Sequence, residues 1–193
     1  MKTKAVLCLG AVALVGVAAA AVVAANEDAR KKAYEFTLPD LHGKNFSLKD
    51  CQGRIVVLEW VNKGCPVWAG KVGLLNKTYK DYVDKGVVWL GIDSTHHVKA
   101  EDNLIYMVRN DVTKPILLDP DGKVGKAYDA RTTPHMFIVD KEGKIAYDGD
   151  INENRRGDGG KNFVAQALDE LLAGKPVSEP KTNPNGCTVK YKE

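Results

Sequence analysis

Cysteine is scarce in this sequence, and the spacings that usually bind metals are missing. The 193 residues include four cysteines, with no Cys-x-x-Cys pair, and four histidines, with no His-x-x-x-His pair. Structural and catalytic zinc sites depend on such spacings, so we expect no metal site. The adjacent His96 and His97 do not change this, because neighbouring side chains on a strand point to opposite sides.

A large excess of one charge is also absent. The chain has 28 Lys and Arg against 25 Asp and Glu, and its basic clusters at 30–32 and 155–156 are short. Nucleic-acid binding calls for a broader basic surface, so no nucleic-acid partner is expected. The glycine-rich stretch 157–160 lacks the Lys-Ser/Thr of a phosphate loop, and nothing in the sequence implies an organic cofactor.

The N-terminus has the pattern of a targeting segment. Basic residues at 2 and 4 precede an apolar stretch over 5–25 that ends in small residues. This pattern predicts a cleaved signal peptide over 1–25, and the rival interpretation is an uncleaved membrane anchor through 5–25. We therefore expect an exported protein in a periplasmic or other extracytoplasmic, oxidising compartment, with a membrane-anchored form as the alternative.

The remainder predicts one α/β domain over 33–174 and an extended tail over 175–193, which is rich in Pro and Asn. A hairpin is expected over 34–48, before the first long strand. Apolar runs predict the further strands 55–61, 86–93, 115–118, 135–140 and 144–147. Helical spacing predicts helices at 67–84, 99–110, 124–128 and 161–173. Long strands joined through helices imply parallel pairs, and the closing hairpin adds antiparallel strands. The result is a mixed sheet flanked by helices, with an N-terminal hairpin extension.

Cys65 lies where the strand 55–61 should give way to a helix that starts at Pro66. Proline suits the first helical position, which makes Cys65 the helix N-cap. The positive end of the helix favours a thiolate, and this effect would lower the cysteine pKa from about 8.5 to about 7–8. Cys65 is therefore predicted to be a reactive nucleophile, provided that solvent reaches its sulfur. The alternative is a buried, inert thiol.

Cleavage of the N-terminal segment would leave Cys51, Cys65 and Cys187, an odd number. Cys187 could resolve an oxidised Cys65, could form a structural bridge to Cys51, or could do neither. Glu59 is an acid in an otherwise apolar strand. Burial would raise its pKa, which would suit a proton shuttle to the sulfur, although a paired structural acid is the competing interpretation.

Three stretches carry a resemblance to a known family: 62–66 around Cys65, Thr-Thr-Pro-His-Met-Phe-Ile-Val-Asp at 132–140, and the closing run 140–149. They resemble the thioredoxin fold in its redoxin form, closest to peroxiredoxin-like members of the AhpC/TSA and thioredoxin superfamily. The resemblance implies that Pro134 is a cis proline, which exposes the backbone of Thr133 to an extended partner.

The same resemblance implies that Asn62, Pro66, Thr133 and Pro134 contact the substrate. It also shows two departures. Asn62 stands where reductases carry the first cysteine of their pair and where peroxiredoxins carry threonine. Pro134 stands where the peroxiredoxin arginine is expected, and Arg131 lies three residues earlier.

The expected function is that of an exported, thiol-based antioxidant or oxidoreductase. The Cys65 thiolate would attack a peroxide, or a disulfide of a protein or small molecule, and Cys187 or an external thiol reductant would complete the cycle. Two alternatives remain open. One is a monothiol disulfide-exchange protein, and the other is a non-catalytic binding module that uses the groove beside Pro134.

Overall fold

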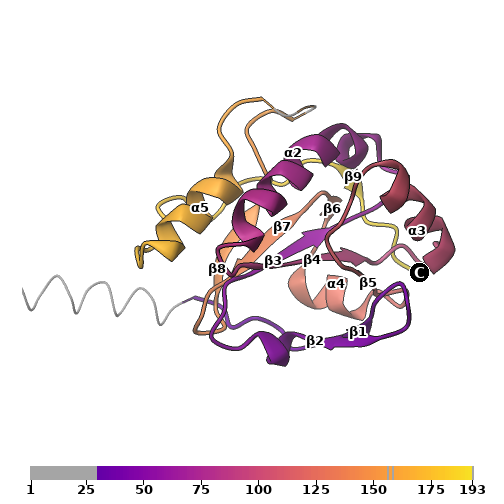
Figure 1. The fold of residues 1–193 in the computed structure, drawn as a ribbon, viewed down its shortest axis with the longest axis horizontal. Coiled ribbons are helices and arrows are strands. Elements are labelled where there is room, and N and C mark those ends of the chain that lie inside the picture. Colours follow the sequence, from indigo (N-terminus) through magenta and orange to yellow (C-terminus); the bar gives the residue numbers. More distant parts are fainter. Residues whose placement is uncertain (1–29, 156, 158, 193) are drawn as a thin grey trace, which may run out of the picture. The chain divides into compact units, whose positions relative to one another are not determined.

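A mixed five-stranded sheet forms the centre of the fold, with strand order β5-β4-β3-β7-β8 (Figure 1). The strands are β3 (Val56–Trp60), β4 (Val88–Asp93), β5 (Ile116–Leu118), β7 (Met136–Val139) and β8 (Ile145–Gly149). β3 runs parallel to β4, and β4 runs parallel to β5, whereas β3–β7 and β7–β8 are antiparallel. The predicted α/β thioredoxin-like fold is therefore confirmed.

The computed structural model describes residues 30–155, 157 and 159–192. The predicted signal peptide or anchor over 1–25 lies outside this part of the chain. Residues Lys32–Glu193 form one compact unit. Among the described residues, no helix has the length and apolar character needed to cross a bilayer.

Helices cover both faces of the sheet because side chains alternate along each strand. Val57 packs on one face with residues of α2 (Pro66–Val83), α3 (Ala100–Arg109) and α5 (Phe163–Leu172). Its neighbour Val56 packs on the other face with residues of α4 (Lys123–Tyr128). That second face also holds residues of β1 (Thr37–Pro39) and of the 3₁₀ helix η1 (Leu48–Cys51).

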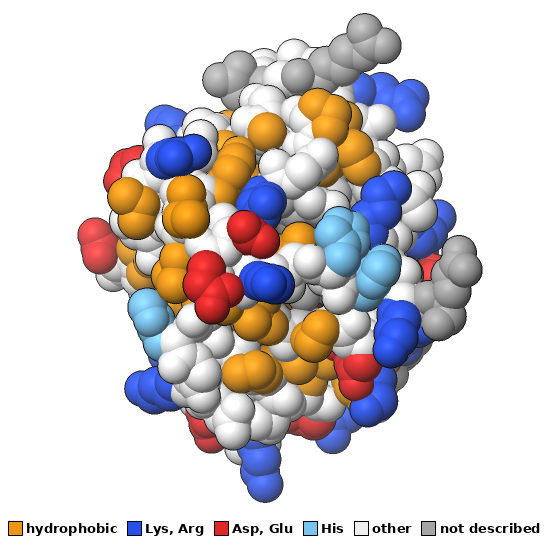
Figure 2. Space-filling view, turned by 90° about the vertical axis from the view of Figure 1, so that its right-hand side faces the viewer, with side chains coloured by type: hydrophobic (Ala, Val, Ile, Leu, Met, Phe, Trp, Pro, Cys, Tyr) orange, Lys and Arg blue, Asp and Glu red, His pale blue; other side chains and the backbone are white. Residues whose placement is uncertain are grey.

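The predicted N-terminal hairpin is present as β1 and β2 (Asn45–Ser47), which are shorter than the expected strands. On the molecular face drawn in Figure 2, acidic and basic side chains are interspersed with apolar ones. That face presents no broad patch of a single charge.

The C-terminal tail adds a strand pair that the sequence did not predict. Two short strands, β6 (Thr132–Thr133) and β9 (Cys187–Thr188), pair antiparallel. Val189 is buried beside them, and Tyr191 donates from its hydroxyl to the carbonyl of Ala130 at 2.7 Å. The tail is joined to the domain along much of its length.

Candidate active site

Cys65 is the N-cap of α2, as the sequence predicts, and Pro66 follows at the start of the helix. The strand β3 delivers the chain to this point, and the sulfur of Cys65 accepts a hydrogen bond from the backbone N–H of Trp68 at 3.4 Å. This first-turn amide has no acceptor within the helix, and it donates to the sulfur instead. This is the electrostatic setting in which a thiolate is favoured.

The peptide bond between Thr133 and Pro134 is cis, as the resemblance implied. The thiol of Cys65 donates to the backbone carbonyl of Thr133, with the sulfur and oxygen 3.0 Å apart. The cis-proline segment therefore lies against the sulfur, although the two are 68 residues apart in sequence.

Cys187 completes the site from the opposite end of the chain. Its sulfur lies 2.6 Å from that of Cys65, and Cys187 is the β9 residue that pairs with Thr133. All three described cysteines are free thiols. Cys51 packs in the core on the other face of the sheet from Cys65, so the structure brings Cys187 to Cys65 and not to Cys51.

The two neighbouring thiols have pKa values displaced in opposite directions. Burial raises the pKa of Cys65. Hydrogen bonds from the Cys187 thiol, the Thr133 side chain and the Trp68 amide outweigh it, so the pKa lies below its ordinary value. Burial and the adjacent Cys65 sulfur both raise the pKa of Cys187. Cys65 is therefore the sulfur that ionises first.

The sequence led us to expect a solvent-reachable sulfur, and here the structure differs. Only 1% of Cys65 is exposed, whereas Cys187 is partly exposed. The physical reason is the tail, because β9 and Cys187 lie over the sulfur. Pro66 remains exposed beside it. The lowered pKa of Cys65 thus comes from hydrogen bonds to its sulfur and not from exposure to solvent.

Glu59 lies beneath the site, and its carboxylate is fully engaged. It accepts from the indole N–H groups of Trp68 and Trp89, both at 2.8 Å, and forms an ion pair with Lys114 at 2.7 Å. Glu59 and Lys114 are both buried. The contacts link the acid to Cys65 through Trp68, and its role as a proton shuttle stays a prediction.

Asn62 shapes the loop in front of the helix. Its side-chain oxygen accepts from the backbone N–H of Gly64 at 2.7 Å, and its carbonyl accepts from the N–H of Cys65 at 3.0 Å. The side chain is buried. These contacts fix the approach to Cys65, and a direct contact between Asn62 and substrate remains a prediction.

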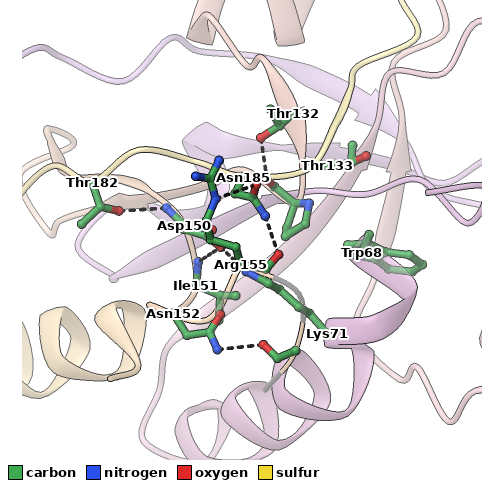
Figure 3. Close-up of polar contacts among 12 residues, drawn as sticks. Trp68, Lys71, Thr132, Thr133, Asp150, Ile151, Asn152, Arg155, Thr182 and Asn185 are labelled. Atoms are coloured by element: carbon green, nitrogen blue, oxygen red, sulfur yellow. Dashed lines mark hydrogen bonds and ion pairs between the residues drawn. The ribbon is translucent and has the colours of Figure 1, made fainter. Parts of the chain in front are cut away.

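Sequence reasoning missed a second buried ion pair near the site. Lys71 of α2 is fully buried, and its ammonium lies 2.7 Å from the carboxylate of Asp150 (Figure 3). A buried lysine needs such a partner, but only the fold brings the two together. The one available signal was a lysine among the apolar positions of the helix. Within the described residues, no group of three His, Cys, Asp or Glu side chains is placed to hold a metal ion.

Comparison with curated proteins gives a thiol-disulfide oxidoreductase and a thioredoxin-like protein as relatives. The thiol-disulfide oxidoreductase ResA of Bacillus thuringiensis subsp. konkukian (strain 97-27) is 30% identical over 115 residues, which are 60% of this chain and 65% of ResA. The thioredoxin-like protein YneN of Bacillus subtilis (strain 168) is 29% identical over 116 residues, 60% of this chain and 67% of YneN. The ResA match spans slightly less than two thirds of that relative.

Solved structures agree with the observed fold. An uncharacterized conserved protein from Geobacillus kaustophilus is similar at a TM-score of 0.76 and 30% identity, over 84% of this chain and 92% of that one. The thioredoxin domain of a thiol-disulfide oxidoreductase from Bacteroides vulgatus is similar at a TM-score of 0.56 and 30% identity, over 66% of this chain and 89% of that domain. Residues 29–148, more than half of the sequence, match the AhpC/TSA family, and the chain therefore belongs to that family.

Proposed function

We propose that this protein is a thiol-disulfide oxidoreductase whose redox pair is Cys65 and Cys187. The observation that carries the proposal is the 2.6 Å separation of the two sulfurs at the N-terminus of α2. A disulfide bond requires about 2.05 Å, so a small movement joins them. Cys187 thus supplies the partner thiol that a Cys-x-x-Cys motif would carry at the position of Asn62.

The opposite pKa displacements assign the roles. The Cys65 thiolate attacks a disulfide, forms a mixed disulfide and releases the first substrate sulfur as a thiolate. Cys187, whose pKa is raised, keeps its proton until this step has removed the negative charge from Cys65. It then loses that proton to water and attacks the Cys65 sulfur, which forms the Cys65–Cys187 disulfide and releases the second substrate thiol. An external thiol reductant restores the dithiol.

A disulfide is a better candidate substrate than a peroxide. Two of the similar proteins, ResA and the Bacteroides vulgatus domain, are named thiol-disulfide oxidoreductases. Asn62, at the position of the peroxiredoxin threonine, directs its side-chain oxygen to Gly64, and Arg131 is exposed. Neither residue is therefore placed like the threonine and arginine that polarise a peroxide in peroxiredoxins. The antioxidant interpretation thus receives less support than disulfide exchange.

The proposed setting follows from the N-terminal sequence. A cleaved signal peptide, or a tether through residues 5–25, would place the domain in an extracytoplasmic, oxidising compartment. Partners there would be polypeptide disulfides and an external thiol reductant. In the same proposal Glu59 acts through Trp68, which makes it a positioning residue for the sulfur.

Thiol mapping tests the proposal. The reduced domain is mixed with oxidised glutathione or, separately, with one equivalent of hydrogen peroxide, and the disulfides are located by peptide mass analysis. We expect glutathione disulfide to yield a Cys65–Cys187 bond, and Cys187→Ser to stop at a mixed disulfide on Cys65. Cys51→Ser is the matched control and should behave as the wild type. If Cys65→Ser exchanges as fast as the wild type, the proposal is wrong. A faster reaction with peroxide would favour the antioxidant function.

A further inference from the structure

The strand edge beside the catalytic sulfur is already occupied by the protein's own tail. In the β6–β9 pair, Thr133 lies opposite Cys187 and Thr132 lies opposite Thr188. The N–H of Val189 donates to the carbonyl of Arg131 at 3.1 Å. An incoming polypeptide would use the same backbone groups, because an exposed strand edge binds partners by adding a strand. Tail and partner therefore compete for one edge.

Gly186 sets how closely a strand can approach this edge. A Cβ atom at this position would overlap the carbonyl oxygen of Thr133 and would lie 2.5 Å from its carbonyl carbon. The φ angle of Gly186 is not in the left-handed region, so contact distance alone requires glycine here. The β6 edge thus accepts a strand in which glycine precedes the cysteine that lies opposite Thr133.

Contacts on both sides of Gly186 hold the tail in this position. The hydroxyl of Thr182 accepts from the backbone N–H of Asp150 at 3.0 Å, and the side chain of Asn185 exchanges hydrogen bonds with Arg155 (Figure 3). Beyond Cys187, Val189 is buried. The tail is therefore held against the domain on both sides of the redox cysteine.

We propose that residues 185–189 are an intramolecular stand-in for the substrate, and that the foreign substrate is an extended polypeptide disulfide in which glycine precedes the reacting cysteine. This inference rests on the proposed function. Only 1% of Cys65 is exposed while the tail is bound, so in this proposal the tail leaves before a partner binds.

In the open state the Cys65 thiolate, which still accepts a hydrogen bond from the backbone N–H of Trp68, attacks the partner's Gly-Cys sulfur. The partner's second sulfur departs as a thiolate that takes a proton from water. When the tail returns, Cys187 gives its proton to water and its sulfur attacks Cys65. The partner's first cysteine leaves as a thiolate and is protonated, so two electrons pass from the dithiol to the partner.

The first experiment measures access to Cys65 in the full chain carrying Cys187→Ser, by its rate of alkylation with iodoacetamide. Adding Gly186→Ala should weaken the tail's docking and raise this rate roughly tenfold, since a side chain forced into a packed contact displaces it. Asn185→Ala, which removes the contacts with Arg155, should also raise the rate and keeps the test valid if Gly186→Ala folds poorly. Gly73→Ala is the matched control, because Gly73 is exposed on α2 with open space around it, and it should leave the rate unchanged.

The second experiment measures selectivity in the Gly186→Ala/Cys187→Ser variant. Two peptides carry their cysteine as a thiopyridyl disulfide, one with the tail sequence Asn-Gly-Cys-Thr-Val and one with valine in place of glycine. Release of thiopyridone should be roughly tenfold faster with the glycine peptide. Equal rates for both peptides, or an alkylation rate that neither tail substitution changes, would overturn the inference while leaving the proposed function intact. Failure of both peptides to form a mixed disulfide with an alkylatable Cys65 would instead count against the proposed function.

Discussion

Trp68 joins Glu59 to the reactive sulfur: its indole N–H donates to the carboxylate of Glu59 at 2.8 Å, and its backbone N–H donates to the sulfur of Cys65. The same carboxylate neutralises Lys114, which is buried with it. The start of α2 is therefore fixed to the buried centre of the sheet through a charged group. This arrangement makes Glu59 both a structural residue and a positioning residue.

Replacing Glu59 with glutamine should destabilise the fold. The change retains much of the side-chain shape but leaves the Lys114 ammonium buried without its counter-charge, which costs about 3–5 kcal/mol. Urea denaturation should show this loss in the free energy of unfolding. The double variant Glu59→Gln/Lys114→Met removes both charges and should recover most of the stability. A single variant as stable as the wild type would contradict the ion-pair assignment.

The pKa of the Cys65 thiol should lie below its ordinary value. The hydrogen bond from the Cys187 thiol leads the contributions that lower this pKa. In Cys187→Ala that contribution is absent, so the pKa of Cys65 should rise. A smaller fraction of Cys65 is then thiolate at neutral pH, and the intrinsic rate of its alkylation should fall in proportion. The pH dependence of thiolate absorbance measures both values. Identical titration curves would show that Cys187 does not stabilise the thiolate.

Oxidation should stabilise the protein. A Cys65–Cys187 bond links residues separated by 122 positions. Restricting the unfolded chain over a loop of this size contributes about 4–5 kcal/mol in the chain-entropy description, which corresponds to a rise in Tm of roughly 10 °C for a domain of this size. Thermal unfolding with and without a thiol reductant measures the difference. Cys187→Ser should show no such dependence, and an equal reductant effect in that variant would refute the pairing.

The pairing of Asp148 with His135 should make the free energy of unfolding fall in acid. Burial raises the pKa of Asp148, but its hydrogen bond to His135 at 2.7 Å and its pairing with Lys181 lower the pKa below the ordinary value. The stabilisation is therefore complete above the unfolded-state pKa, which is about 3.9, and disappears as the pH falls through the lower folded-state value. Asp148→Asn should flatten the stability profile below about pH 4 in urea titrations. Glu142→Gln, an exposed acid on the turn before β8, serves as the control.

The sequence revealed those parts of the site that depend on neighbours along the chain. The N-cap position of Cys65 follows from the strand before it and from Pro66 after it, and the cis bond before Pro134 was implied by the family resemblance of residues 132–140. The order of strands and helices was likewise readable from periodicity. Each of these features is determined within a window of a few residues.

The remaining features depend on contacts between distant segments. Nothing around Cys187 shows strand periodicity, because β9 has only two residues and forms against β6. The partners of Lys71 and Lys114 lie on other elements, so their burial could not be inferred from their own surroundings. The covering of Cys65 has the same origin, since it depends on where the tail returns.

Cys51 lies on the opposite face of the sheet from the redox pair, and burial raises its pKa. The sheet thereby separates this sulfur from the other two, and burial disfavours ionisation of its thiol. The three cysteines of the described residues offer three ways to pair, but once the sheet has formed a single pairing is within reach. Oxidation of the folded domain therefore leads directly to the Cys65–Cys187 bond, with no mispaired disulfide to rearrange.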